Sequence, residues 1–552
     1  MSNSNTNFFH GVQGFITNIQ GKPISAIRSS IVGMVVSCGK GPVNVPTLVF
    51  GNITDAFNKF GPSLGDGFTG PQAMKAVFDQ IGTLICVINV CDPAVHNTSV
   101  VSEVVSLARI TGKGSAANRY FVSNPTLGGS ASAPVTVGGA GTWAVPTGVT
   151  VTGVKSAKGG TVLTGGSGDG QWSVTSGVLT VHGTAAYNQT YWVTYSATFV
   201  RGTDFTTNSD LGQVARVNTS SILLPQADVT VSYTYVDPTK VTATDIIGAT
   251  QAGEDPATGI YALRSAPTYP GILVKPKVLI APGFSDTLSV GQALDEAAAV
   301  LNGRAILDGV NDDYASAITY AGNFAGDDSR VTVHYPRYLI THPVTTGTLL
   351  DVPASPFIAG LIARVDKIDG KGNPYVSPSN KSITGVAGLT RPVDASPVNI
   401  GETAGESVQQ FINSNDVMTS IFLDGWRAYG NTQANGKFLC VYRMADFVIE
   451  SAALALVWAV DKAINGPALL DQILTVVRHF LRALENQGAL VANPSPDTDN
   501  DVWFPPELNT PDQTAQGIAF LNFRMNPPTM LQQLVVTGQL TNEFVKQLFA
   551  AN

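Results

Sequence analysis

Residues 277–336 read KVLIAPGFSDTLSVGQALDEAAAVLNGRAILDGVNDDYASAITYAGNFAGDDSRVTVHYP, and this stretch decides the fold of the chain's centre. Three short apolar runs predict strands, and the segments between them predict helices, the first capped by Ser289. The predicted strands are 277–282, 304–309 and 330–336, and the predicted helices are 290–302 and 312–324. Strands that alternate with helices in this way indicate a parallel, doubly wound sheet.

The beginning of the chain carries a similar α/β pattern. The runs IRSSIVGMVVS, PTLVFG and TLICVINV predict strands at 27–37, 46–51 and 83–90. Between the last two, Thr54 or Asp55 is placed to cap a short helix that ends before Gly61-Pro62, and a second helix spans 71–82. The sequence therefore predicts an α/β core built from more than one region.

A β-rich segment interrupts this core. Residues 128–236 contain 17 Gly and only eight charged residues, whose charges sum to zero. The segments GQWSVTSGVLTVHG (170–183) and QTYWVTYSATFV (189–200) alternate with period two. This pattern predicts a sandwich or small barrel, inserted at a surface loop of the core. Trp143, Trp172, Tyr191 and Trp192 could stack on sugars in this module, and aromatic core packing is the alternative.

The charge content favours self-assembly over nucleic-acid binding. Only 13% of the 552 residues are charged, which suits a protein whose surface is largely covered by other copies. The net charge of -8 argues against a protein that binds nucleic acid through an overall basic face. Residues 1–54 hold three bases and no acid (+3), whereas 401–552 hold 15 acids and 8 bases (-7). These ends suit head-to-tail contact between copies, with ordinary surface variation as the alternative.

Both ends of the chain differ from its centre. Residues 1–24 are polar and Gly-rich but carry six large apolar side chains, which a frayed terminus does not require: Phe8, Phe9, Val12, Phe15, Ile16 and Ile19.

Near the other end, helices are predicted at 443–464 and from Pro467 to just before Gly488, and a strand at 517–525. The first helix contains Asp446, Glu450, Asp461 and Lys462, so it predicts a buried amphipathic helix and no membrane span. The N-terminus lacks the features of a signal peptide, which favours cytoplasmic synthesis.

The sequence contains no recognisable catalytic or ligand motif. Phosphate-binding glycine motifs, a nucleophile elbow and a zinc-protease motif are all missing from the sequence, and the six His are scattered. A serine-hydrolase-like alternative would combine Ser285 and Asp308 with His334 or His342, although His334 sits in a predicted strand where packing roles are common. Cys38, Cys86 and Cys91 lie in or beside apolar runs and suit core thiols. We therefore predict no catalytic, cofactor or metal residues and no enzymatic activity.

A series of blocks in fixed order resembles the contractile tail sheath proteins of bacteriophages and related injection machines. The blocks run from about residue 26 to 540, broken by the β-rich segment. They are PTLVFGNITDAFNKFG (46–61), PQAMKAVFDQIG (71–82), TLICVINV (83–90), VLIAPGFSD (278–286), SITGVAGLTRPV (382–393), LDGWRAYGN (423–431), FLCVYRMADFVIESAA (438–453) and GIAFLNFRMNPPTMLQQLVVTG (517–538).

The resemblance implies an α/β core of several domains with a β-rich inserted domain and extended N- and C-terminal arms. Its doubly wound middle domain would have subtilisin-like topology without a serine-protease motif, and the insertion would face outward. The implied parts are a linking arm at 1–24, an α/β sheath domain at 25–127, the insertion at 128–243, the middle domain at 244–394, a C-terminal sheath core domain at 395–526 and a second linking arm at 527–552.

The resemblance also implies the function and the partners. The chain would be the structural subunit of a virion tail sheath that polymerises helically, as stacked hexameric rings, around an inner tail tube. Contraction would drive the tube through the target cell envelope, with baseplate and tail terminator proteins as further partners and no nucleic acid or membrane. Its arms would add strands to neighbouring subunits through 12–19 and 532–538, the latter containing Leu534, Val535 and Val536. Gly11, Gly14 and Gly21 would be hinges, and Arg478 and Arg482 would face the tube, unless they form only a solvated helix face.

Overall fold

The computed structural model describes most of the chain as two compact units. The larger unit holds the described residues from 28 to 367 and from 378 to 437, and the smaller unit holds 374–377 and those from 438 onward. The described residues are 28–63, 67–107, 114–115, 120–253, 255–367, 374–394, 407–463, 467–493, 501–536 and 538.

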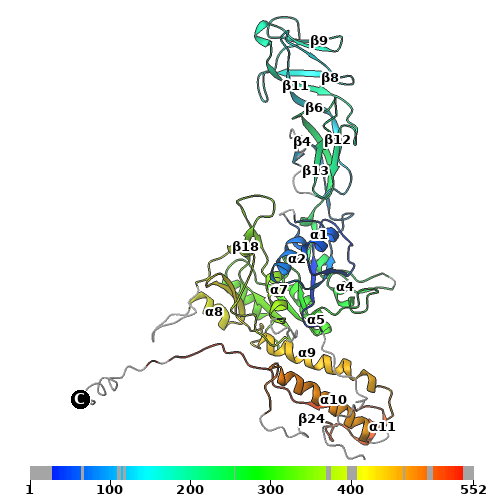
Figure 1. The fold of residues 1–552 in the computed structure, drawn as a ribbon, viewed down its shortest axis with the longest axis vertical. Coiled ribbons are helices and arrows are strands. Elements are labelled where there is room, and N and C mark those ends of the chain that lie inside the picture. Colours follow the sequence, from blue (N-terminus) through cyan, green and yellow to red (C-terminus); the bar gives the residue numbers. More distant parts are fainter. Residues whose placement is uncertain are drawn as a thin grey trace, which may run out of the picture. The chain divides into compact units, whose positions relative to one another are not determined.

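A nine-stranded sheet forms the centre of the larger unit (Figure 1). Its inner strands, β3 to β22, run parallel, and β2, β23 and β20 pair antiparallel at the two edges. In spatial order the strands are β2 (Thr47–Phe50), β3 (Leu84–Asn89), β1 (Val32–Val36), β15 (Val278–Ile280), β16 (Arg304–Asp308), β17 (Val331–His334), β22 (Val417–Phe422), β23 (Trp426–Tyr429) and β20 (Lys381–Ser382). The sheet thus takes strands from three of the predicted domains, 25–127, 244–394 and 395–526, and these regions share one sheet.

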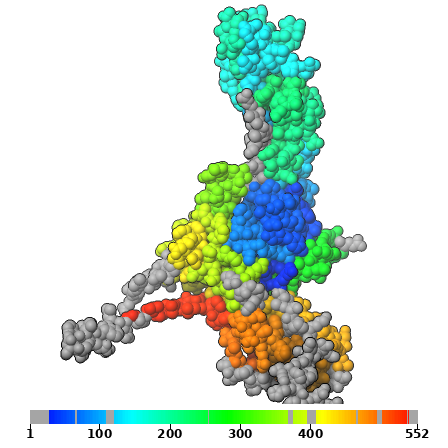
Figure 2. Space-filling view, in the orientation of Figure 1, coloured from blue at the N-terminus to red at the C-terminus, as the bar shows by residue number. Residues whose placement is uncertain are grey.

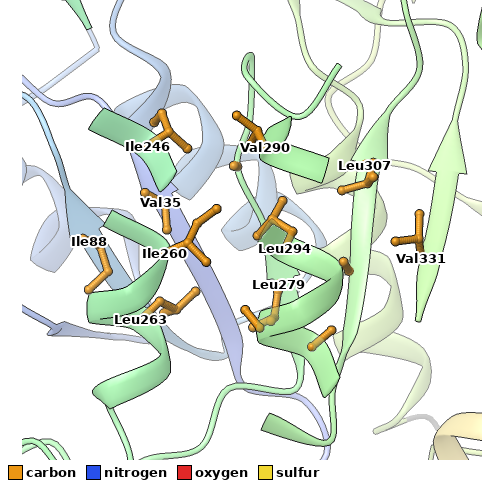
Figure 3. Close-up of a cluster of buried hydrophobic side chains, with 14 of the residues drawn as sticks. Val35, Ile88, Ile246, Ile260, Leu263, Leu279, Val290, Leu294, Leu307 and Val331 are labelled. Carbon is orange, nitrogen blue, oxygen red and sulfur yellow. The ribbon is translucent and has the colours of Figure 1, made fainter. Parts of the chain in front are cut away.

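Helices cover both faces of this sheet. On one face, Val35, Leu279 and Leu307 belong to a large apolar cluster with residues of α4, α5 and α6 (Figure 3). On the other face, α7 contacts α2 and strands β1, β15 and β16. The helices of the unit are α1 (Ile53–Phe60), α2 (Thr69–Gln80), α3 (Ala243–Ile247), α4 (Gly259–Ser265), α5 (Leu288–Leu301), α6 (Tyr314–Gly322), α7 (Ser355–Val365) and α8 (Val408–Ser414). The order and parallel pairing predicted for 277–336 are confirmed, since β15, α5, β16, α6 and β17 follow in that order with parallel strands. The predicted cap at Ser289 was wrong, because α5 begins at Leu288 with Thr287 as its cap residue.

Two local details complete the α/β body. Asn52 is the cap of α1, because its side chain accepts a hydrogen bond from the backbone N–H of Asp55, so the predicted cap at Thr54 or Asp55 was wrong. The Asp55 carboxylate instead accepts from the backbone N–H of Phe50 and binds Lys59. A separate three-stranded sheet consists of β19 (Leu349–Val352), β18 (Tyr338–Thr341) and β21 (Gly388–Leu389).

The β-rich insertion contains three antiparallel sheets around two apolar cores. The main sheet has the order β4 (Asn97–Ser106), β14 (Asp228–Val236), β6 (Thr126–Thr136), β11 (Thr190–Ser196) and β8 (Thr150–Lys155). The others are β7 (Thr142–Ala144), β10 (Val178–Val181) and β9 (Trp172–Thr175), and β12 (Phe205–Asn208), β13 (Gln213–Arg216) and β5 (Gly114–Ser115). The insertion therefore begins at β4, whereas the predicted start at 128 falls inside β6. Sequence reasoning missed β4 because its partner β14 lies more than a hundred residues away.

The smaller unit packs two long helices on a short sheet. Helix α10 (Pro467–Asn486) begins at the predicted Pro467, and Val477, Phe480, Leu481 and Leu484 line its buried face. Helix α9 (Leu439–Ala455) ends before the predicted 464 and is followed by a short 3₁₀ turn, Val457–Ala459. The remaining elements are α11 (Pro511–Ala515), β24 (Val502–Trp503) and β25 (Asn522–Phe523), so only two residues of the predicted strand 517–525 are paired. None of the helices in the described part of the chain combines the length and apolar character needed to cross a bilayer.

Candidate functional site

An extended apolar segment follows β25 in the smaller unit. Residues 526–536 form neither helix nor strand, and the side chains of Leu534, Val535 and Val536 are 72%, 76% and 82% exposed. In the space-filling view the segment (red) is a narrow strip that leaves the helical part of its unit (orange; Figure 2). The structure thus places the predicted C-terminal arm residues in solvent, with their apolar side chains uncovered. The predicted N-terminal arm and hinge residues lie outside the described residues: Phe8, Phe9, Val12, Phe15, Ile16, Ile19, Gly11, Gly14 and Gly21.

The segment follows a short sheet of two strands. Val502 pairs with Phe523 and Trp503 with Asn522, and no third strand joins them among the residues that the structure describes. The backbone N–H of Arg524 donates to the carbonyl of Asp501 at 2.9 Å, which extends the ladder by one step. A two-stranded sheet is marginal alone, and a further strand that pairs with one of its edges would stabilise it. On β24 the Val502 carbonyl already accepts from Arg478. Sequence reasoning missed β24, because a two-residue strand before Pro505 carries no alternating pattern.

Helix α10 holds the two arginines predicted to face the tube. Arg478 is half-buried, and its guanidinium donates to the carbonyl of Val502 on β24 at 3.1 Å. Arg482, one turn further along, is exposed. Both line a cavity of about 320 Å³, together with Glu485, Asp501 and Arg524. Arg478 therefore joins α10 to the short sheet, and Arg482 is the one of the pair that is freely presented to solvent.

Ser285 and Asp308 meet, as the hydrolase alternative requires, but as parts of a buried hydrogen-bond network. The Ser285 hydroxyl donates to the Asp308 carboxylate at 3.0 Å and accepts from the Asp308 backbone N–H. Ser355 donates to the same carboxylate through its hydroxyl at 2.7 Å and through its backbone N–H at 2.8 Å. All three residues are buried. Ser285 thus ties α7 and β16 to the loop after β15, and it has neither access to solvent nor a histidine among these partners.

The two candidate histidines lie elsewhere. His334 on β17 is buried, and its Nε2 is 3.1 Å from both the Ser420 hydroxyl and the Tyr338 hydroxyl. Burial lowers the pKa of His334 to about 3, so the ring is neutral at physiological pH. His342 accepts hydrogen bonds from the backbone N–H groups of Val344 and Thr345 in the turn after β18. The geometry therefore assembles no Ser-His-Asp relay from the predicted candidates.

The aromatic residues proposed for glycan binding are mostly used for packing. Trp143, Trp172 and Tyr191 pack against the apolar core of the outer part of the insertion, and the indole N–H of Trp172 donates to the Leu163 carbonyl. The fourth residue, Trp192, lies under the ammonium group of Lys158 at 4.9 Å. This arrangement favours the core-packing alternative.

The described residues show no cluster of metal-ligand side chains and no exposed thiol. No group of three or more His, Cys, Asp or Glu side chains is close enough to hold a metal ion in the described part of the chain. All four cysteines are buried and form no disulfide, and burial raises the pKa of Cys86 and Cys91 to about 12. Thiols of such high pKa remain protonated and are poor nucleophiles.

Comparison with known proteins places the chain among structural tail proteins. No protein-family model matches it. The chain is 28% identical to the tail sheath protein of Burkholderia phage BcepMu over 99% of both chains. It is 32% identical to a putative prophage major tail sheath protein of Pseudomonas aeruginosa strain UCBPP-PA14, over 51% of this chain and 68% of that protein. The solved helical sheath of the anti-feeding prophage in its contracted state has a similar fold, with 14% identity, a TM-score of 0.50 and 98% of this chain covered.

Proposed function

The chain belongs to the family of tail sheath proteins, and on that premise we propose that its arms link it to further copies of itself in a contractile sheath. It is a structural component of a virion tail. The observation that carries the proposed linkage is the segment 531–536, whose four apolar side chains are exposed and which follows the two-stranded sheet β24–β25.

The physical argument is strand addition. An extended segment that joins a sheet edge gains backbone hydrogen bonds, and its alternate side chains fix the register. The side chains of Leu534 and Val536 would share one face of such a strand. Burying both of these side chains would stabilise the contact between the two copies by about 3–6 kcal/mol. The acceptor is the β24–β25 sheet of a neighbouring copy. The N-terminal arm, with 12–19 as its strand and Gly11, Gly14 and Gly21 as hinges, is proposed to act in the same way.

Such a contact generates a helical assembly. The arm and the sheet edge are different surfaces, so each copy donates to one neighbour and accepts from another, and the series need not close. Stacked hexameric rings around an inner tube are one such arrangement, with baseplate and terminator proteins at the two ends. Arg482 is the proposed tube-facing residue, since Arg478 already binds the Val502 carbonyl.

The resemblance to a subtilisin-like middle domain rests on the parallel strands β15, β16 and β17 with their covering helices.

The insertion is proposed to face outward in the sheath. The P. aeruginosa relative matches 51% of this chain but 68% of its own length, so that relative is the shorter protein. A shorter sheath protein without an equivalent segment would pack by the same core surfaces. An insertion that faced the neighbours would disturb those surfaces, whereas an outward one leaves them intact.

Two matched double variants test the arm. Leu534→Asp/Val536→Asp places two carboxylates on the strand face that is proposed to be buried. Val101→Asp/Val104→Asp, on the exposed strand β4 of the insertion, makes the same change at side chains that are also largely exposed. We expect the arm variant to sediment as a folded monomer and the β4 variant to assemble like the unmodified chain. Normal assembly by the arm variant would contradict the linkage.

A further inference from the structure

The β-rich insertion touches the α/β body at more places than its two connecting strands require. The chain leaves the body before β4 and returns after β14, and at this crossing the backbone N–H of Asp237 donates to the carbonyl of His96 at 2.9 Å. Thr98 also donates to the Asp237 carboxylate at 2.6 Å. Two adjacent crossing strands alone would leave the insertion free to rotate about them, and relative motion is the usual expectation for such domains.

Tyr120 provides a third contact. It belongs to the insertion, because its carbonyl accepts from the backbone N–H of Val236 at the end of β14. Its side chain is nevertheless only 2% exposed and is part of the apolar cluster of the body. The ring lies edge-on to Phe68 with centroids 5.2 Å apart, and the hydroxyl donates to the Pro62 carbonyl at 2.6 Å.

Two glycines of the body make room for this ring. A Cβ on Gly39 would lie 1.9 Å from the Tyr120 ring, and a Cβ on Gly61 would lie 2.3 Å from its hydroxyl oxygen. Gly61 also has a φ of +82°, which favours glycine. Gly39, Gly61, Pro62 and Phe68 therefore form a fitted recess, which we call the Tyr120 socket.

The turn between β12 and β13 provides a fourth contact. Leu211 packs against the apolar cluster of the body, and Asp210 forms an ion pair with Lys40 at 2.7 Å. This exposed ion pair contributes little by itself. The turn is tied to the socket, because the backbone N–H of Phe121 donates to the carbonyl of Ser209.

We infer that the Tyr120 socket locks the insertion to the α/β body, so that the two move as one rigid part. The crossing strands define a possible axis of rotation, and the two additional contacts, joined to each other, block rotation about it. The insertion is then a rigid projection of the subunit and not a tethered module, so any rotation of the body carries the outer part of the insertion with it.

Distance measurements between spin labels test this lock. Because all four native thiols are buried, labels can be directed to Ala157→Cys in the insertion and Ala299→Cys on α5, both exposed positions. Labelled chains are diluted into unlabelled chains so that only distances within one chain are read. The chain that carries only the two labelling substitutions is the background protein. We expect one narrow distance distribution in this protein and in Tyr120→Phe, which keeps the ring in its recess.

Tyr120→Ala is expected to lose the narrow distribution, because it empties the recess. Gly39→Ala is also expected to lose the narrow distribution, because the added methyl group displaces the ring. This variant replaces Tyr120→Ala in the test if Tyr120→Ala does not fold. Tyr187→Ala, at a half-exposed tyrosine in the outer part of the insertion, is the matched control and should leave the distribution narrow. A broad distribution in the background protein, or an unchanged one in folded Tyr120→Ala, would overturn the inference.

Discussion

His334 lies on β17 with its side chain 1% exposed, between the hydroxyl groups of Ser420 and Tyr338. The sequence pattern predicted a strand at 330–336 that contains His334. A position inside a strand favoured a packing role for this side chain over a catalytic one, and the structure shows it buried. The sequence could not show which hydroxyl groups surround it, because Ser420 comes from β22, more than eighty residues away. The same limit applies to Arg478, whose binding to the carbonyl of Val502 depends on β24, a strand too short to predict.

The buried His334 makes the stability of the fold depend on pH. Burial lowers its pKa to about 3, whereas the value in an unfolded chain is near 6.5. Between these values the unfolded chain binds more protons, so the free energy of unfolding falls as the pH decreases. The loss from one such group approaches about 1.4 kcal/mol per pH unit.

His334→Gln should remove this part of the pH dependence while keeping a polar side chain beside Ser420. We expect the unmodified protein to lose more stability than the variant between about pH 7 and about pH 5, in denaturant unfolding followed by circular dichroism. His479→Gln, at an exposed position on α10, is the control. Parallel pH profiles for the unmodified protein and His334→Gln would show that His334 is not the source.

At the scale of elements, the insertion shows what a sequence pattern can and cannot predict. Its period-two segments and turn glycines correctly indicated β structure, because both signals are local. Its first strand, β4, was missed, since only pairing with the distant β14 identifies it. Helix α10 was predicted with its correct first residue, because Pro467 and the apolar spacing both lie within the helix itself.

The observed ends of the insertion specify where it can be removed. His96 and Asp237 are joined by a backbone hydrogen bond of 2.9 Å, so a short glycine linker can replace 97–236. We expect this deletion to give a soluble protein that still assembles, as judged by sedimentation, with some loss of stability because the Tyr120 socket is emptied.

Removing 128–243, the predicted insertion, should behave differently. It keeps β4 but deletes its partner β14, which leaves a ten-residue strand with an unpaired edge and exposed valines. Such an edge favours aggregation. Equal solubility of the two deletions would contradict the assignment of β4 to the insertion.

At the scale of the whole molecule, the nine-stranded sheet gathers strands from regions that the family resemblance had divided among three domains. The alternation of strands and helices predicted the type of sheet but not which distant strands would join it. The charge pattern belongs to the same scale. A +3 beginning and a -7 end suit contact between copies, and the low charge content suits a surface that other copies cover.

Negative-stain electron microscopy of the purified full-length chain, over a range of protein concentrations, tests the central claim most directly. The claim is that the chain is a sheath subunit whose exposed arms join it to further copies. The account predicts hollow, striated cylinders without any other protein present. Folded particles that remain single at every concentration would contradict it.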